Sequence, residues 1–195
     1  MTKNATVFRS ILVLLAIGLA GPALAQTTRR APPPASSSSQ ATRVGPLMGI
    51  EFFDGDSGLA LRGDAQVPLS RLSPTVNLDG VLSAGLSFVD AGPFDVTIFK
   101  LVPALRLTAP LTPTVGLYGD LGLGLYYASI DDDRLFLQDD DDDSDVGLQM
   151  RVAGGIFADI SPTVRLGGEL GINPYLAGDL DETSVSLMFS AMFRL

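Results

Sequence analysis

The sequence predicts an all-β fold, an eight-stranded antiparallel up-and-down transmembrane β-barrel. Three observations predict it. The chain opens with an export signal, a turn phrase recurs three times and leads into a strand each time, and the charged residues inside the predicted strands share one face. A chain of 195 residues suits one such domain with extensions at its ends.

The composition excludes several classes of function. Lys and Arg number 13 against 22 Asp and Glu, and the resulting net charge of -9 has the wrong sign for binding nucleic acid. The chain has no Cys and no His, which excludes disulfides and thiolate metal sites and removes the commonest general base. Hydrophobic residues make up 46%, yet after residue 25 no apolar run is long enough for a membrane-spanning helix. The chain is therefore either a soluble protein or a membrane barrel.

Residues 1–25 have the pattern of a cleavable signal peptide. Lys3 and Arg9 give a positive start, residues 11–20 are apolar, and Ala23-Leu24-Ala25 places small residues where a signal peptidase reads them. The apolar stretch is too short to serve as a membrane anchor, so we expect cleavage before Gln26.

Residues 26–44 form a predicted disordered periplasmic leader. They include three consecutive prolines and four consecutive serines, and such a composition cannot bury enough apolar surface to offset the entropy of ordering. The barrel itself is predicted to occupy residues 45–195.

One phrase occurs three times: an apolar residue, a hydroxyl residue, Pro, Thr, Val, any residue, Leu, any residue, Gly. Its copies are Leu72–Gly80, Leu111–Gly119 and Ile160–Gly168, spaced by 39 and then 49 residues. Pro presets the turn, and Thr-Val-x-Leu begins the alternation of a strand. Two strands with their connections fit into one repeat, so the repeated unit is a hairpin.

Alternation between these turns predicts eight strands, most of them longer than the usual strand of a soluble protein. They cover residues 45–54, 58–69, 75–88, 94–109, 114–129, 145–160, 163–175 and 183–195. Pro103 falls inside the fourth, where it cannot donate to the ladder, so we expect a bulge or another local irregularity there.

The strands separate into an apolar and a polar face, and the charges on the polar face balance. Six are positive and six negative: Glu51, Arg62, Asp64, Asp79, Lys100, Arg106, Asp120, Arg151, Asp159, Arg165, Glu169 and Arg194. A balanced set is what a closed interior requires, because an unpaired buried charge is costly. We therefore predict that these residues form a charge network inside the barrel.

The alternative is a soluble periplasmic, lipocalin-like barrel with its apolar face inside. Besides the charge balance, two features favour the membrane. The predicted connections are asymmetric, with tight Pro turns at 70–74, 110–113 and 161–162 opposite longer loops at 89–93, 130–144 and 176–182. Aromatic residues also gather near the loops, as in an interfacial girdle: Phe52, Phe53, Phe88, Phe94, Tyr126, Tyr127 and Tyr175.

With its signal peptide, eight long strands, short Pro turns and a chain that stops on its final strand, the sequence resembles the small outer-membrane barrels of the OmpA, OmpX and OmpW type over residues 45–195. The resemblance implies a cell outer membrane location, contact with outer-membrane lipid and lipopolysaccharide, and insertion by the outer-membrane assembly machinery. That machinery reads an aromatic residue near the end of the last strand, here Phe193, although this chain ends in Arg194-Leu195 and has no Trp.

A barrel of this kind has three candidate functions. The first is a non-enzymatic, structural or surface-interaction barrel plugged by its charge network, and the second is a narrow, OmpW-like channel for small molecules. Inward-facing glycines could leave free volume for such a channel, but close packing of strands explains them better: Gly116, Gly122, Gly124, Gly147, Gly155 and Gly171. The third, an enzyme, lacks the histidine that would activate a hydroxyl. A closed barrel has no free edge, so we expect a monomer, without a cofactor.

An acidic segment carries a separate hypothesis. Nine carboxylates fall within residues 131–145, and as hard ligands they could bind Ca²⁺ or Mg²⁺ and bridge to anionic lipopolysaccharide. Their spacing matches no EF-hand or RTX-type calcium loop, which need Gly at set positions, so a solvated charge run is the simpler interpretation. The residues are Asp131, Asp132, Asp133, Asp139, Asp140, Asp141, Asp142, Asp143 and Asp145.

Overall fold

The computed structural model describes residues 41–195 except 54, 92–93, 133–143 and 179–181. The predicted signal peptide and nearly all of the predicted leader therefore lie outside the described residues. Within the described part, no helix is long and apolar enough to cross a membrane.

Eight strands account for most of the described chain. They are β1 (Arg43–Phe52), β2 (Ser57–Ser73), β3 (Val76–Ala91), β4 (Phe94–Pro110), β5 (Val115–Asp132), β6 (Ser144–Asp159), β7 (Val164–Ala177) and β8 (Thr183–Arg194). Every predicted strand is present. The first begins at Arg43, within the segment that the sequence assigned to the leader.

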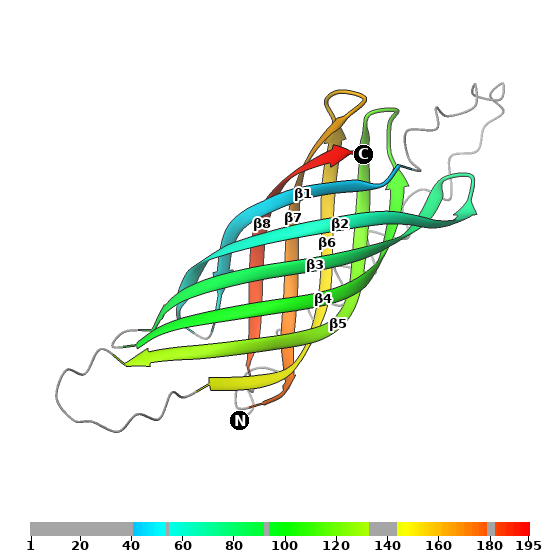
Figure 1. The fold of residues 1–195 in the computed structure, drawn as a ribbon. Helices are drawn as coiled ribbons and strands as arrows, with labels where there is room; N and C mark the ends of the chain where they lie inside the picture. Colours follow the sequence, from blue (N-terminus) through cyan, green and yellow to red (C-terminus); the bar gives the residue numbers. More distant parts are fainter. Residues whose placement is uncertain (1–40, 54, 92–93, 133–143, 179–181) are drawn as a thin grey trace, which may run out of the picture. The chain divides into compact units, whose positions relative to one another are not determined.

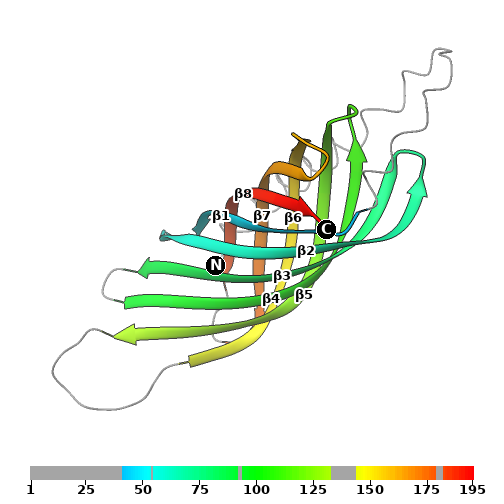
Figure 2. The ribbon, with the colours of Figure 1, turned by 45° about the horizontal axis from the view of Figure 1, so that its top comes forward.

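The strands form a closed antiparallel barrel in which each strand pairs with the next and β8 pairs with β1. Figures 1 and 2 show this ring, with the colours running from β1 in blue to β8 in red. The predicted fold class is confirmed. We call the end that carries the connections at 74–75, 111–114 and 160–163 the turn end, and the opposite end the loop end. With eight strands, β1 starts and β8 finishes at the turn end.

The repeated phrase forms the turns. Thr112 Oγ1 accepts hydrogen bonds from the N–H groups of Val115 at 2.9 Å and Thr114 at 3.3 Å. Ser161 Oγ does the same for the third copy, accepting from Val164 at 3.0 Å and Thr163 at 3.3 Å. In these two copies the hydroxyl residue before the proline thus satisfies two backbone donors of the tight turn, and in the first copy Ser73 Oγ accepts from one, the N–H of Thr75 at 3.3 Å.

Pro103 interrupts the ladder between β4 and β5 without shifting it. Leu101 pairs with Leu125 and Ala104 with Gly122 in one register, while Val102 and Pro103 have no partner on β5. The expected irregularity is therefore a gap and not a bulge, because proline removes a donor but adds no residue to the strand.

The apolar face points outward. Phe189, Leu121 and Met48 expose 65%, 60% and 59% of their surfaces, whereas Glu169 and Asp64 expose 2% and 3%. This is the reverse of a soluble barrel, so the lipocalin-like alternative, which needs an apolar interior, is wrong. An apolar outer wall around a charged interior is the arrangement of a membrane barrel.

Candidate functional site

The candidate site is the lumen of the barrel. Of the twelve predicted charges, eleven have side chains that are buried or half-buried there: Glu51, Arg62, Asp64, Asp79, Lys100, Arg106, Asp120, Arg151, Asp159, Arg165 and Glu169. The prediction for Arg194 is wrong. Arg194 is exposed and has no ion pair with any described residue, because it is the last residue of β8 and lies where the lumen opens.

Arg43 is the sixth buried positive charge, a role that the sequence predicts for Arg194. It is 3% exposed, and its guanidinium lies 3.7 Å from the carboxylate of Asp159. With Arg43 in place of Arg194, the predicted network therefore still has six positive and six negative members among the described residues. The signal that could have found Arg43 is its parity, since it continues the inward alternation of Leu47 and Glu51 on β1.

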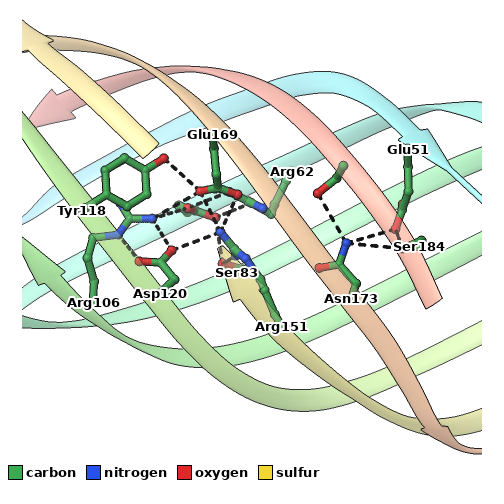
Figure 3. A network of polar contacts seen from close by, with 12 residues as sticks. Glu51, Arg62, Ser83, Arg106, Tyr118, Asp120, Arg151, Glu169, Asn173 and Ser184 are labelled. Carbon is green, nitrogen blue, oxygen red and sulfur yellow. Dashed lines mark hydrogen bonds and ion pairs between the residues drawn. The ribbon is translucent and has the colours of Figure 1, made fainter. Parts of the chain in front are cut away.

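The middle of the lumen holds a central cluster of three arginines and three carboxylates from five strands: Arg62, Asp64, Arg106, Asp120, Arg151 and Glu169. Figure 3 labels all of them except Asp64. Glu169 on β7 accepts from Arg62 at 2.9 Å and from Arg151 at 2.8 Å. Asp120 on β5 accepts from Arg106 at 2.6 Å and from Arg151 at 3.1 Å. Each arginine lies within ion-pair distance of at least two of these carboxylates. The positive and negative charges therefore neutralise one another inside the cluster.

Two neutral side chains complete this cluster. The Tyr118 hydroxyl donates to Glu169 at 2.9 Å, and the Arg106 guanidinium lies 4.1 Å from the centre of the Tyr118 ring. Ser83 on β3 donates to Asp64 at 2.8 Å and accepts from Arg151 at 2.8 Å. Sequence reasoning missed both residues, although each lies on the inward face by parity.

A second group fills the lumen nearer the loop end. Lys100 on β4 lies 2.5 Å from the carboxylate of Glu51 on β1, and Ser87 and Ser184 both donate to the same carboxylate. Asn173 on β7 bonds Ser184 at 3.3 Å, as Figure 3 also shows. Together with the central cluster, this group joins side chains from all eight strands.

Aromatic rings cover this second group. The ring centres of Tyr126 and Tyr175 are 4.9 Å apart at an angle of 88°, and Phe53 stacks on Tyr175. The ammonium of Lys100 lies 5.6 Å from the Tyr175 ring centre. These rings were predicted as part of an outer girdle, but Tyr126 and Tyr175 are buried inside the barrel. Phe52, Phe88 and Tyr127 are exposed on the outer face.

At the turn end, Arg165 reaches Asp159 at 2.8 Å and stacks on Phe157 at 3.6 Å from the ring centre. Asp79 differs from the other carboxylates because it has no ion pair within the described residues. It accepts from Gln66 at 3.0 Å and from Thr108 at 3.1 Å. The charge network therefore includes one carboxylate that neutral donors satisfy.

Two small cavities lie in the lumen between described residues. A cavity of about 40 Å³ lies beside Glu51, Lys100 and Arg151, and one of about 10 Å³ lies beside Arg106 and Arg165. A water molecule needs about 10 to 15 Å³ on this measure, so the larger cavity has room for a few waters.

The inward glycines do not enlarge this space. A Cβ placed on Gly155 would lie 2.4 Å from the Tyr118 ring, and one on Gly116 would lie 2.3 Å from Phe157. The side chains of Tyr118 and Phe157 occupy the space that the glycines leave, which supports close packing over an open channel.

The acidic segment falls mostly outside the described residues. Asp131 and Asp132 belong to β5, and Asp145 accepts a hydrogen bond from the Tyr126 hydroxyl at 2.5 Å. The remaining predicted ligands, Asp133 and Asp139 to Asp143, are not described. Within the described residues no group of three or more Asp or Glu side chains could hold a metal ion, so the cation hypothesis stays a prediction.

A closed eight-stranded barrel with an apolar outer wall and a charge-paired lumen defines the class of small transmembrane β-barrels. Comparison with solved structures agrees. Neisserial surface protein A superposes with a TM-score of 0.63 at 14% identity, over 79% of this chain and 96% of that chain. Ail, the attachment invasion locus protein of Yersinia pestis, gives 0.52 at 14% identity, over 80% and 97%.

The outer membrane enzyme PagL also superposes, with a TM-score of 0.50 at 12% identity, over 80% of this chain and 100% of that chain. No protein-family model matches the sequence, and no curated protein matches it. At these identities the comparisons establish a shared fold, that of small outer-membrane β-barrels.

Proposed function

We propose that this protein is a closed, non-enzymatic outer-membrane barrel with a structural or surface-interaction role, whose loops face the cell exterior. The observation that carries the proposal is the central cluster. Its six charged side chains meet across the lumen and compensate one another within hydrogen-bonding distance. A lumen filled in this way holds the wall rigid and resists the passage of solutes.

The absence of enzymatic activity rests on the chemistry of the inward hydroxyls. Ser87 and Ser184 both donate to Glu51, and Ser83 donates to Asp64. Each of these carboxylates is also paired with a cation, so neither is a free base. The chain has no histidine to take a proton from a serine. The fold is shared with an enzyme, but the groups that an enzyme of the serine–histidine type needs are absent from the sequence.

The first experiment isolates the protein from the envelope of an expressing Gram-negative host in mild detergent. Unboiled and boiled samples are compared on a gel, and the folded protein is then placed in a planar bilayer. We expect a heat-modifiable band, which reports a closed barrel, and no current steps above the baseline.

Two results would contradict this proposal in different ways. Discrete current steps from the heat-modifiable protein would favour the narrow channel instead. Cooperative folding in buffer without detergent would show that the protein is not a membrane protein.

A further inference from the structure

Within the described residues, the outer wall of the barrel carries a hollow much larger than the two cavities of the lumen. A groove of about 680 Å³ crosses the outer faces of β8, β1, β2, β3 and β4, which are neighbours in the ring (Figure 1). Its volume lies within the usual range of small-molecule sites, about 300 to 1,000 Å³. The function proposed above depends on the lumen and gives this outer groove no role.

Small residues form the floor of this groove. Gly63 on β2 pairs with Pro46 on β1 and with Ala84 on β3, and the β1–β8 register brings Ala191 next to Pro46. These four positions make one continuous row across four strands. Because none of them carries a long side chain, the wall is thin along this row.

Large apolar residues form a ridge along one side of the floor. Met48 pairs with Phe189 and Leu61, and Leu86 pairs with Leu61 and Phe99, so the five side chains make an unbroken row. Each exposes between 38% and 65% of its surface. The groove also reaches Arg62, but that guanidinium is paired with Asp64 and Glu169, so the groove contains no uncompensated charge.

The dimensions of the groove match a single linear hydrocarbon chain. Five strands at the usual spacing give a length of about 19 Å, and the ridge stands two residues from the floor, about 7 Å along each strand. A helix with its side chains is about 10 to 12 Å across, wider than this step between floor and ridge.

We propose that this groove binds one acyl chain of a phospholipid from the surrounding bilayer. The inference rests on the proposed membrane location, since hydrocarbon is then the medium at the mouth of the groove. A chain lying between the floor and the ridge contacts protein on more than one side, whereas a chain on a flat wall contacts it on one. This lipid should therefore leave the barrel more slowly than its neighbours.

The test is retention of lipid by the folded protein in mild detergent. The protein is mixed with dipalmitoyl phosphatidylethanolamine, and native mass spectrometry counts the lipids bound to each barrel. The test variant is Gly63→Leu, which fills the floor. The matched control is Gly154→Leu, on the outer face of β6 and outside the groove. A Cβ meets nothing closer than 4.0 Å at Gly63 and 3.8 Å at Gly154, so both positions have room for it.

We expect wild type and Gly154→Leu to retain one lipid in similar fractions. Gly63→Leu should retain it about tenfold less, the loss expected when about two methylene groups are no longer buried. A smaller outer hollow of about 450 Å³ beside Pro103 could hold lipid in all three proteins. The readout is therefore the change caused by the substitution and not the total number of lipids.

Equal retention by wild type and Gly63→Leu would overturn the proposal. So would the absence of lipid from every protein, or a dimer that Gly63→Leu disrupts, which would assign the groove to a second copy. The heat-modifiable gel shift separates these failures from loss of the barrel itself. If Gly63→Leu does not fold, Ala84→Leu fills the neighbouring floor position and gives the same test.

Discussion

Arg62 on β2 and Glu169 on β7 are 107 residues apart in sequence and are joined in the lumen by two hydrogen bonds of 2.9 and 3.0 Å. Glu169 also accepts from Arg151 and from Tyr118, so one carboxylate connects β2, β5, β6 and β7. It is the residue on which most of the central cluster converges.

Glu169→Gln is expected to lower the free energy of unfolding by about 3 to 5 kcal/mol, because it leaves two buried arginines without their shared counter-charge. Urea unfolding in lipid vesicles measures the change. Glu182→Gln removes the same charge at an exposed position near the loop end and should change stability by less than about 0.5 kcal/mol. Equal effects of the two substitutions would contradict the role given to the central cluster.

Arg43→Gln and Arg194→Gln are expected to differ, although the two arginines face each other on neighbouring strands. Arg43 is buried beside Asp159, so its loss should cost about 1 to 3 kcal/mol. Arg194 is exposed, and its loss should stay within about 0.5 kcal/mol. The same urea titration measures both. If Arg194→Gln lost more stability than this, Arg194 would belong to the interior network after all.

Gly155→Ala is expected to destabilise the barrel by about 1 to 3 kcal/mol, because the added methyl overlaps the Tyr118 ring. Its neighbour Gly154 faces outward, where a Cβ finds nothing closer than 3.8 Å, so Gly154→Ala should be neutral or slightly stabilising. Thermal unfolding in detergent compares the two. If Gly155→Ala were as stable as Gly154→Ala, the lumen would have more room than the packing of Tyr118 allows.

The cation hypothesis for the acidic segment predicts protection from protease. Binding of Ca²⁺ by several carboxylates should order the chain around Arg134, so calcium at about 1 to 10 mM should slow trypsin cleavage there. Replacing Asp139 to Asp143 with Asn should abolish the effect. If calcium leaves the cleavage rate of the wild-type protein unchanged, the segment is a solvated charge run.

Alternation between the repeated Pro turns is enough to predict the strands, since a side chain's face in a barrel depends only on its parity. Every strand was found, with ends that differ by no more than four residues. The end residues were the least predictable part. Arg43 and Arg194 both have inward parity, but only the closure of β1 against β8 decides which of them the lumen covers.

The partners within the network could not be predicted from alternation. Which residues meet across a lumen depends on the stagger between strands, which no single strand encodes. Arg62 and Glu169 are on non-neighbouring strands, and so are Lys100 and Glu51. The neutral members Tyr118 and Ser83 carry no charge pattern that would have drawn attention to them.

The pairing of β8 with β1 has a consequence for how the chain reaches its native state. Among the described residues, the twelve residues of β8 supply the partner for the side of β1 that β2 leaves free. Until they are in place, two strand edges stay open, and Glu51 lacks Ser184. Closure of the ring must therefore be a late event that joins the most distant parts of the chain, and a high contact order of this kind slows folding. A chain interrupted before β8 would present two unpaired edges and be prone to aggregate.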